Sequence, residues 1–100
     1  MTNKMRAIHP GEILKEELEE LNLSANAFAK ALDVPTNRIT ALLNEQRGIT
    51  ADTALRLARY FGSTPDFWMN LQSSYDVKIA RAAVGKAIEQ SVKPRELLAA

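Results

Sequence analysis

Apolar residues recur at helical spacing along nearly the whole chain, and this periodicity constrains the fold more than any other feature of the sequence. Leu14, Leu18 and Leu21, for example, follow one another at intervals of three or four residues, as on one face of a helix. No stretch of any length alternates apolar and polar residues, which is the pattern of a half-buried strand. The sequence therefore predicts an all-α domain.

Residues that begin or end helices separate these periodic stretches. Pro10 suits a first helical turn, because its missing N–H would have no partner there. Ser24 and Thr50 offer hydroxyls that cap a helix start, and Gly62 is typical of a left-handed helix end. We expect five helices: one that starts at Pro10, one that follows Ser24, one from about Thr36 to Asn44, one from Thr50 to Gly62 and one that starts at Thr64-Pro65-Asp66. A sixth, with Val77, Ala80, Val84 and Ile88, follows or continues the fifth. The expected inward stripes hold Ile13, Leu14, Leu18, Leu21, Phe28, Ala29, Leu32, Ile39, Leu42, Leu43, Ala54, Leu55, Leu57, Ala58, Phe61, Phe67, Trp68 and Leu71.

Length and composition fit one soluble globular domain. One hundred residues suffice for a single modest core, and 46% apolar with 25% charged residues is an ordinary balance. The chain has no cysteine, which excludes disulfides, thiolate metal sites and cysteine nucleophiles. Its apolar runs are too short to span a membrane or to form a secretory signal, so the expected location is the cytoplasm.

The charges are distributed unevenly, although the net charge of +1 alone indicates no nucleic-acid partner. Residues 1–34 carry four Lys or Arg against six Asp or Glu, and residues 63–100 carry five against four. Residues 35–62 carry four arginines against Glu45 and Asp52. The middle of the chain is therefore mildly basic.

Three residues have the spacing of a helix-turn-helix. This motif needs a small residue where its two helices cross, a turn residue that tolerates unusual backbone angles, and an apolar anchor on the second helix. Ala29 supplies the small residue, Asp33 lies four residues later in the turn, and Ile39 lies ten residues after Ala29. Glycine is usual at the turn, and aspartate tolerates a positive φ better than most other residues.

Three longer stretches make the resemblance specific. "HPGEILKEEL" at 9–18, "LDVPTNRITALLNEQRGITADTALRLARYFG" at 32–62 and "TPDFWMNLQSSYD" at 64–76 resemble the HigA/VapI antitoxin family, whose members have a lambda-repressor-like (XRE-type) helix-turn-helix domain. The resemblance implies about five helices with a C-terminal helical extension. We expect one domain over 1–100, with the helix-turn-helix at 24–44, the matching core at 8–78 and a C-terminal helix and tail at 79–100.

The resemblance also implies partners and residue roles. The protein would be a homodimer that binds a palindromic operator in double-stranded DNA, neutralises a small basic HigB-like RNase toxin and represses its own operon, with no cofactor or metal. The candidates for reading bases are Thr36, Asn37, Arg38 and Thr40, and the candidates for contacting phosphates are Ser24, Asn26, Asn44, Gln46 and Arg47. Chemistry supports the first group, because arginine can bond guanine bidentately, asparagine can bond adenine, and the threonine methyl can meet thymine.

Other polar and aromatic residues have structural interpretations. We expect Arg56 to form an ion pair with Glu12 or another acid of the first helix, and His9 to be a cap or surface residue. Phe67 and Trp68 belong to the core or to a dimer interface. The candidates for that interface are Phe67, Trp68, Leu71, Tyr75, Val84 and Ile88.

Alternatives differ in what the helix-turn-helix does. One histidine, no cysteine and no glycine-rich phosphate loop argue against an enzyme. A stand-alone regulator without a toxin would have the same features in residues 8–78, and an interaction module that has lost DNA binding would be compatible with Asp33 and the low net charge. Candidates for a toxin-binding surface are the region after residue 78 and the arm Thr2–Ile8.

Overall fold

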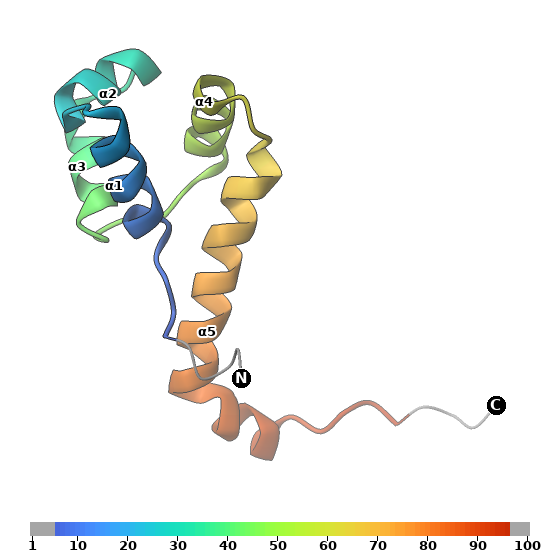
Figure 1. Cartoon of the computed structure of the whole chain (residues 1–100). Helices are drawn as coiled ribbons and strands as arrows, with labels where there is room; N and C mark the ends of the chain where they lie inside the picture. Colours follow the sequence, from blue (N-terminus) through green and yellow to red (C-terminus); the bar gives the residue numbers. More distant parts are fainter. Residues whose placement is uncertain (1–5, 97–100) are drawn as a thin grey trace.

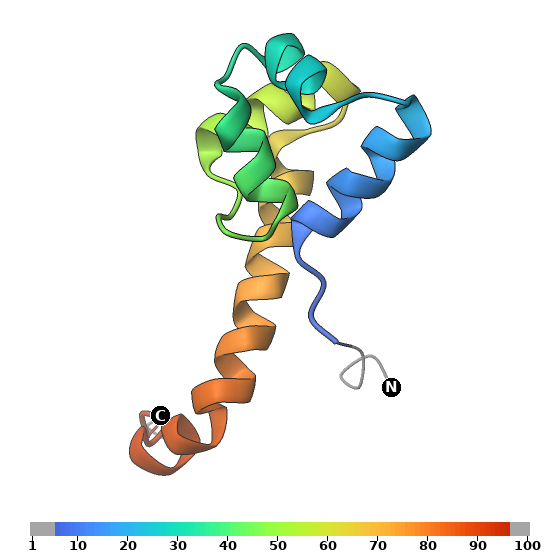
Figure 2. The same cartoon turned by 90° about the vertical axis from the view of Figure 1, so that its left-hand side faces the viewer.

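The computed structural model describes residues 6–96, and these contain five α-helices and no strand (Figure 1). The helices are α1 (Pro10–Leu21), α2 (Ala25–Leu32), α3 (Thr36–Leu43), α4 (Ala51–Phe61) and α5 (Pro65–Ser91). Helices α1 to α4 gather around the first part of α5, and the rest of α5 extends away from them (Figures 1 and 2). The prediction of an all-α domain is confirmed.

Four helices begin at a side chain that accepts a hydrogen bond from the first turn. The acceptor–donor pairs are His9 Nδ1 with Gly11 N, Ser24 Oγ with Ala27 N, Thr50 Oγ1 with Thr53 N and Thr64 Oγ1 with Phe67 N. Each bond satisfies one of the N–H groups that a helix start leaves without a partner. The start signals predicted from the sequence are thus confirmed, and His9 is the cap of α1.

Three helices end at a residue with left-handed backbone angles. Asn22 (φ 55°), Asp33 (φ 59°) and Gly62 (φ 71°) each donate their backbone N–H to a carbonyl of the helix that they terminate. Asp33 therefore adopts the conformation that the turn of a helix-turn-helix was expected to need. Glu45, just after α3, also has a positive φ, of 62°, which the sequence did not indicate.

The core lies between α1, α2, α3, α4 and the start of α5. Its buried members are Leu14, Leu18, Phe28, Ala29, Leu32, Ile39, Leu42, Ile49, Ala54, Leu57, Ala58 and Trp68. Three residues expected to point inward do not: Leu21 is 47% exposed, Leu55 60% and Phe67 47%. Leu21 is the last residue of α1, Leu55 lies outside the buried face of α4, and Phe67 is turned outward because the next residue, Trp68, enters the core.

Helix α5 is a single helix of 27 residues, so the expected sixth helix continues the fifth. Within the described residues it buries Trp68 alone, and Val77, Val84 and Ile88 are each about half exposed. The part of α5 that projects from the other helices (Figure 2) thus has a run of apolar side chains exposed to solvent. No helix within residues 6–96 is long and apolar enough to cross a membrane.

Candidate nucleic-acid interface

Helices α2 and α3 pack through the residues whose spacing predicted the motif. Ala29 is 1% exposed and Ile39 is fully buried. Within the turn, Val34 N donates to Ala29 O at 3.0 Å and Asp33 N donates to Lys30 O at 3.1 Å. These bonds satisfy the last carbonyls of α2 and fix the direction in which α3 leaves the turn. The predicted helix-turn-helix geometry is present.

Helix α3 presents polar side chains on the side opposite the core. Ile39 and Leu42 are buried, Asn37 is exposed, and Thr36 and Thr40 are half-buried. With 3.6 residues per turn, Thr36, Asn37 and Thr40 share the open face, and Figure 2 shows α3 on the surface of the molecule.

Arg38 stands apart from the other base-reading candidates. It lies at the edge of the open face, on the side of α4, and 27% of its side chain is exposed. Its Nη1 donates to Asp52 Oδ1, in the first turn of α4, at 2.8 Å. The structure therefore brings three of the four candidates together on one face and ties the fourth to the neighbouring helix.

A hydrogen bond couples the starts of the two helices of the motif. Thr36 Oγ1 donates to Asn26 Oδ1 at 2.8 Å, which links a base-reading candidate to a phosphate candidate. Ser24 and Asn26 are exposed at the N-terminus of α2, where the helix also directs free N–H groups and a partial positive charge outward. Thr40 Oγ1 donates within its own helix, to Asn37 O at 3.4 Å.

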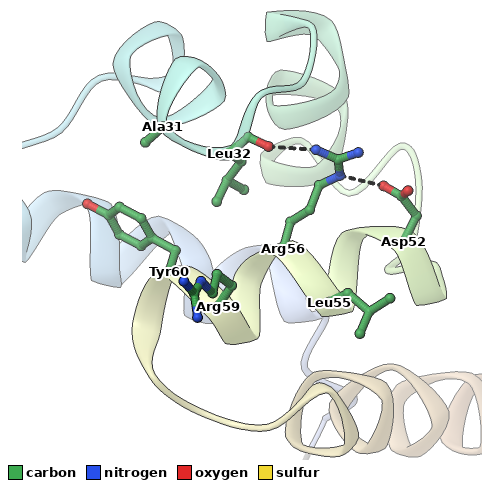
Figure 3. Close-up of a pocket in the computed structure, with 7 residues that line it drawn as sticks. All are labelled: Ala31, Leu32, Asp52, Leu55, Arg56, Arg59 and Tyr60. Atoms are coloured by element: carbon green, nitrogen blue, oxygen red, sulfur yellow. Dashed lines mark hydrogen bonds and ion pairs between the residues drawn. The ribbon is translucent and has the colours of Figure 1, made fainter.

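Asp52 accepts hydrogen bonds from two arginines on the same oxygen. Arg56 Nε donates to Asp52 Oδ1 at 2.7 Å, beside the bond from Arg38. Arg56 Nη1 also donates to Leu32 O at 2.9 Å (Figure 3). The same nitrogen donates to Asp33 O at 3.2 Å. These bonds connect the turn of the motif, through Asp52 and Arg56 of α4, to Arg38 of α3.

The bonds from Arg56 and Arg38 hold the pKa of the Asp52 carboxyl below its usual range, and the bond to Asp52 raises the pKa of Arg56. The expected ion pair of Arg56 is confirmed, but its expected partner is wrong. Glu12 instead pairs with Arg6 through two bonds of 2.7 Å. The i, i+4 spacing of Asp52 and Arg56 is the sequence signal that indicates the true partner.

The chain after α3 carries the remaining phosphate candidates. Asn44, Gln46 and Arg47 are all exposed there. The following segment is held by α5, because Ile49 N donates to Gln72 Oε1 at 2.6 Å. Sequence reasoning missed Gln72, whose partner lies 23 residues away.

The dimer-interface candidates divide into two groups. Trp68 is 3% exposed and its Nε1 donates to Ser63 Oγ at 3.0 Å, so it belongs to the core of the domain rather than to an interface. Leu71 packs against the core, and Tyr75 lies edge-on to His9 with ring centroids 4.8 Å apart. The candidates that remain largely exposed are Phe67, Val84 and Ile88.

Comparisons with known proteins agree with this geometry. The sequence pattern of the helix-turn-helix family matches residues 14–68. Virulence-associated protein I of Dichelobacter nodosus is 61% identical over 79 residues, which cover 78% of this chain and 73% of that protein. The structure of an addiction module antidote protein of the HigA family from Coxiella burnetii has a TM-score of 0.88 and 63% identity, covering 90% of this chain and 99% of the other. The Pseudomonas aeruginosa antitoxin HigA with the higBA promoter has a TM-score of 0.87 and 50% identity, covering 91% and 100%.

Proposed function

This chain belongs to the HigA/VapI family of helix-turn-helix proteins, and we propose that it is a sequence-specific DNA-binding repressor that also serves as the antitoxin of a toxin–antitoxin pair. The observation that carries the proposal is the exposed polar face of α3, set by the packing of Ala29 and Ile39. The antitoxin HigA of Pseudomonas aeruginosa, which superposes over 91% of this chain, was solved with promoter DNA, and this supports DNA binding by the present chain. Family membership makes the chain a regulator rather than an enzyme.

We assign the recognition of DNA base pairs to α3, which would lie in the major groove. Asn37 has an exposed amide that can bond adenine, and Arg38 can bond guanine. The methyl groups of Thr36 and Thr40 can meet the methyl group of thymine. These contacts would distinguish base pairs, because each base pair presents its own donor and acceptor pattern in the major groove.

Phosphate contacts would set the position of α3 on the duplex. Ser24 and Asn26 lie at the N-terminus of α2, where backbone N–H groups attract an anion. The Ser24 oxygen accepts a bond from Ala27 N, and its hydroxyl hydrogen can still be donated to a phosphate. Asn44, Gln46 and Arg47, beyond the end of α3, would contact the backbone on the other side of the reading helix.

We assign the functional unit to a homodimer on a palindromic operator. Helix α3 has only eight residues, and a two-fold pair of such helices can read half-sites one helical turn apart, about 34–36 Å. Val84 and Ile88 are 45% and 50% exposed on the projecting part of α5, and covering them would bury apolar surface. Light scattering at micromolar concentration should give the mass of two chains, and the mass of one chain would contradict this assignment.

The antitoxin role adds a second protein partner, a small basic HigB-like RNase. Its proposed docking regions are residues 79–96 and the segment that ends at Ile8, and Thr2–Met5 of that arm lie outside the described residues. The end of α5 lies far from α3 (Figure 2). A repressor works where the chromosome is, so we place the protein in the cytoplasm.

Binding to the DNA upstream of its own gene tests the repressor role. Fluorescence anisotropy should show a preference for this DNA over a scrambled duplex of equal length. Affinity should fall about 10³-fold or more between roughly 50 and 200 mM salt if several phosphates are contacted. Equal, weak binding to both duplexes with a shallow salt dependence would contradict the proposal.

Co-expression with the product of the adjacent reading frame tests the antitoxin role. If that product is a toxin that stops cell growth, co-expression of the wild-type chain should restore growth. Asn37→Ala should restore growth equally, although it weakens operator binding. If neither chain restores growth, the antitoxin role is contradicted and the protein is a stand-alone repressor.

A further inference from the structure

We propose that Asp52 is a positioning residue for DNA recognition, because its carboxylate holds Arg38 with one edge of the guanidinium free to bond a guanine. The inference rests on the proposed function and extends it to α4, which supplies none of the candidate reading residues. Its basis is a continuous set of bonds that begins in the turn of the motif and ends at α3.

The anchor of this set is Arg56. Its Nη1 donates to two backbone carbonyls of the turn, Leu32 O at 2.9 Å and Asp33 O at 3.2 Å, so the guanidinium is held by the backbone and not only by side chains. Arg56 Nε then donates to Asp52 Oδ1 at 2.7 Å. The position of the carboxylate is thereby set by the turn itself as well as by the backbone of α4 (Figure 3).

The same oxygen accepts the bond from Arg38 Nη1 at 2.8 Å. An arginine has five N–H donors in a planar fork, and Nε and Nη2 form one edge of it. Among the described residues the only hydrogen bond that Arg38 donates from its guanidinium comes from Nη1, so the Nε–Nη2 edge is left free. Two donors on one edge are what the bidentate contact with guanine O6 and N7 requires.

Restraining the side chain before binding has a physical advantage. A free arginine samples many rotamers, and a contact with DNA must order them at the moment of binding. Arg38 bonded to Asp52 has lost part of this freedom already, in the folded protein. The planar guanidinium also makes the orientation of the remaining edge predictable once one nitrogen is held.

The charge of Asp52 separates this role from a general contribution to DNA affinity. The side chain is 57% exposed in the first turn of α4, and bonds from two arginines favour its charged form. A carboxylate near the phosphates repels DNA of any sequence. Asp52 should therefore weaken non-specific binding slightly and strengthen the preference for the operator, whereas a phosphate-contacting residue strengthens both.

The test compares Asp52→Asn, Arg38→Ala and the double variant on the operator and on a scrambled duplex, with purified full-length dimer. Asp52→Asn should lower the ratio of operator affinity to scrambled-duplex affinity about 5- to 10-fold, which is within the range of one bidentate contact. Its affinity for the scrambled duplex should be unchanged or higher. The double variant should have the same ratio as Arg38→Ala alone, since Asp52 acts through Arg38. Glu20→Gln removes one negative charge from α1 and should leave the ratio unchanged.

Two results would overturn the inference: an unchanged ratio in Asp52→Asn, or losses that add in the double variant. If Asp52→Asn does not fold, Asp52→Glu, which displaces the carboxylate by one methylene, takes its place with the same expected outcomes. A wild-type chain without operator preference contradicts the proposed function itself, and this result is distinct from a preference that does not depend on Asp52.

Discussion

Gln72, on α5, accepts a hydrogen bond of 2.6 Å from the backbone nitrogen of Ile49, between α3 and α4. The same side chain donates from Nε2 to Asp76 Oδ1 at 2.9 Å, so its orientation is held from both sides. Gly48 lies against it, because a Cβ added there would come within 2.8 Å of the Gln72 amide. Helix α5, to which we assign the dimer interface, thus supports the segment that follows α3.

Loss of this bond should destabilise the protein. Gln72→Ala leaves the partly buried Ile49 N–H without a partner, which should cost about 1–3 kcal/mol in the free energy of unfolding. Chemical denaturation followed by circular dichroism measures the change. Gln90→Ala, at an exposed position of the same helix, should change stability by less than about 0.5 kcal/mol. Equal effects in the two variants would argue against a supporting role for Gln72.

Gly11 lies where α1 packs directly against the backbone of α3. A Cβ at this position would overlap the backbone oxygen of Leu42, which cannot move aside as a side chain can. Gly11→Ala should therefore destabilise the fold by about 1–3 kcal/mol. Gly85→Ala is the matched control, because its Cβ would approach only the flexible side chain of Arg81, and alanine favours the helix by up to about 1 kcal/mol. Chemical denaturation measures the free energy of unfolding of both variants. If Gly11→Ala leaves this free energy unchanged, α1 can shift away from Leu42 without destabilising the fold.

Asp33 occupies a left-handed position that suits glycine. Its φ of 59° strains an L side chain, and glycine has no such strain. Asp33→Gly should stabilise the domain by about 0.5–1 kcal/mol while operator binding is retained. Gly62→Ala is the reverse change at φ 71° and should destabilise by about 1 kcal/mol. A less stable Asp33→Gly would show that the aspartate side chain contributes more than its backbone strain costs.

The dependence of stability on pH should report the Asp52 ion pairs. Hydrogen bonds from Arg56 and Arg38 lower the pKa of Asp52 in the folded state, so its stabilisation is complete above the pKa of an unfolded aspartate, about 4. That stabilisation is lost as the pH falls through the lower folded pKa. Wild type should lose more stability than Asp52→Asn between about pH 5 and 3, as measured by thermal midpoints. Parallel curves for the two proteins would contradict this.

The exposed apolar face of α5 should decide the oligomeric state. Val84→Asp with Ile88→Asp places two charges on this face, which should give a folded monomer that has lost about 100-fold or more in operator affinity, since two half-sites no longer act together. Ala82→Asp, on the opposite face by helical spacing, should remain dimeric. Mass and affinity are measured by light scattering and anisotropy. If the double variant remains dimeric, the dimer interface does not include this face of α5.

Local signals in the sequence were sufficient to predict where the helices begin and end and where the turn of the motif lies. Ser24, Thr50 and Thr64 cap helices through N–H groups three residues ahead, and Asp33 and Gly62 end helices through carbonyls a few residues back. A partner at such short range is fixed by the chain itself. The exposed polar face of α3 could be predicted for the same reason, because helical spacing places it opposite the buried Ile39 and Leu42.

Contacts between helices were decided only by the tertiary structure. The sequence suggested a first-helix acid for Arg56, whereas packing brings the carbonyls of Leu32 and Asp33 to its guanidinium. Periodicity gave Leu55 and Phe67 an inward position, but the helices are oriented so that other residues of α4 and α5 face the core. The sequence determines where each helix lies along the chain and which face is apolar. The angles at which the helices pack determine which side chains meet, because those angles depend on many distant contacts at once.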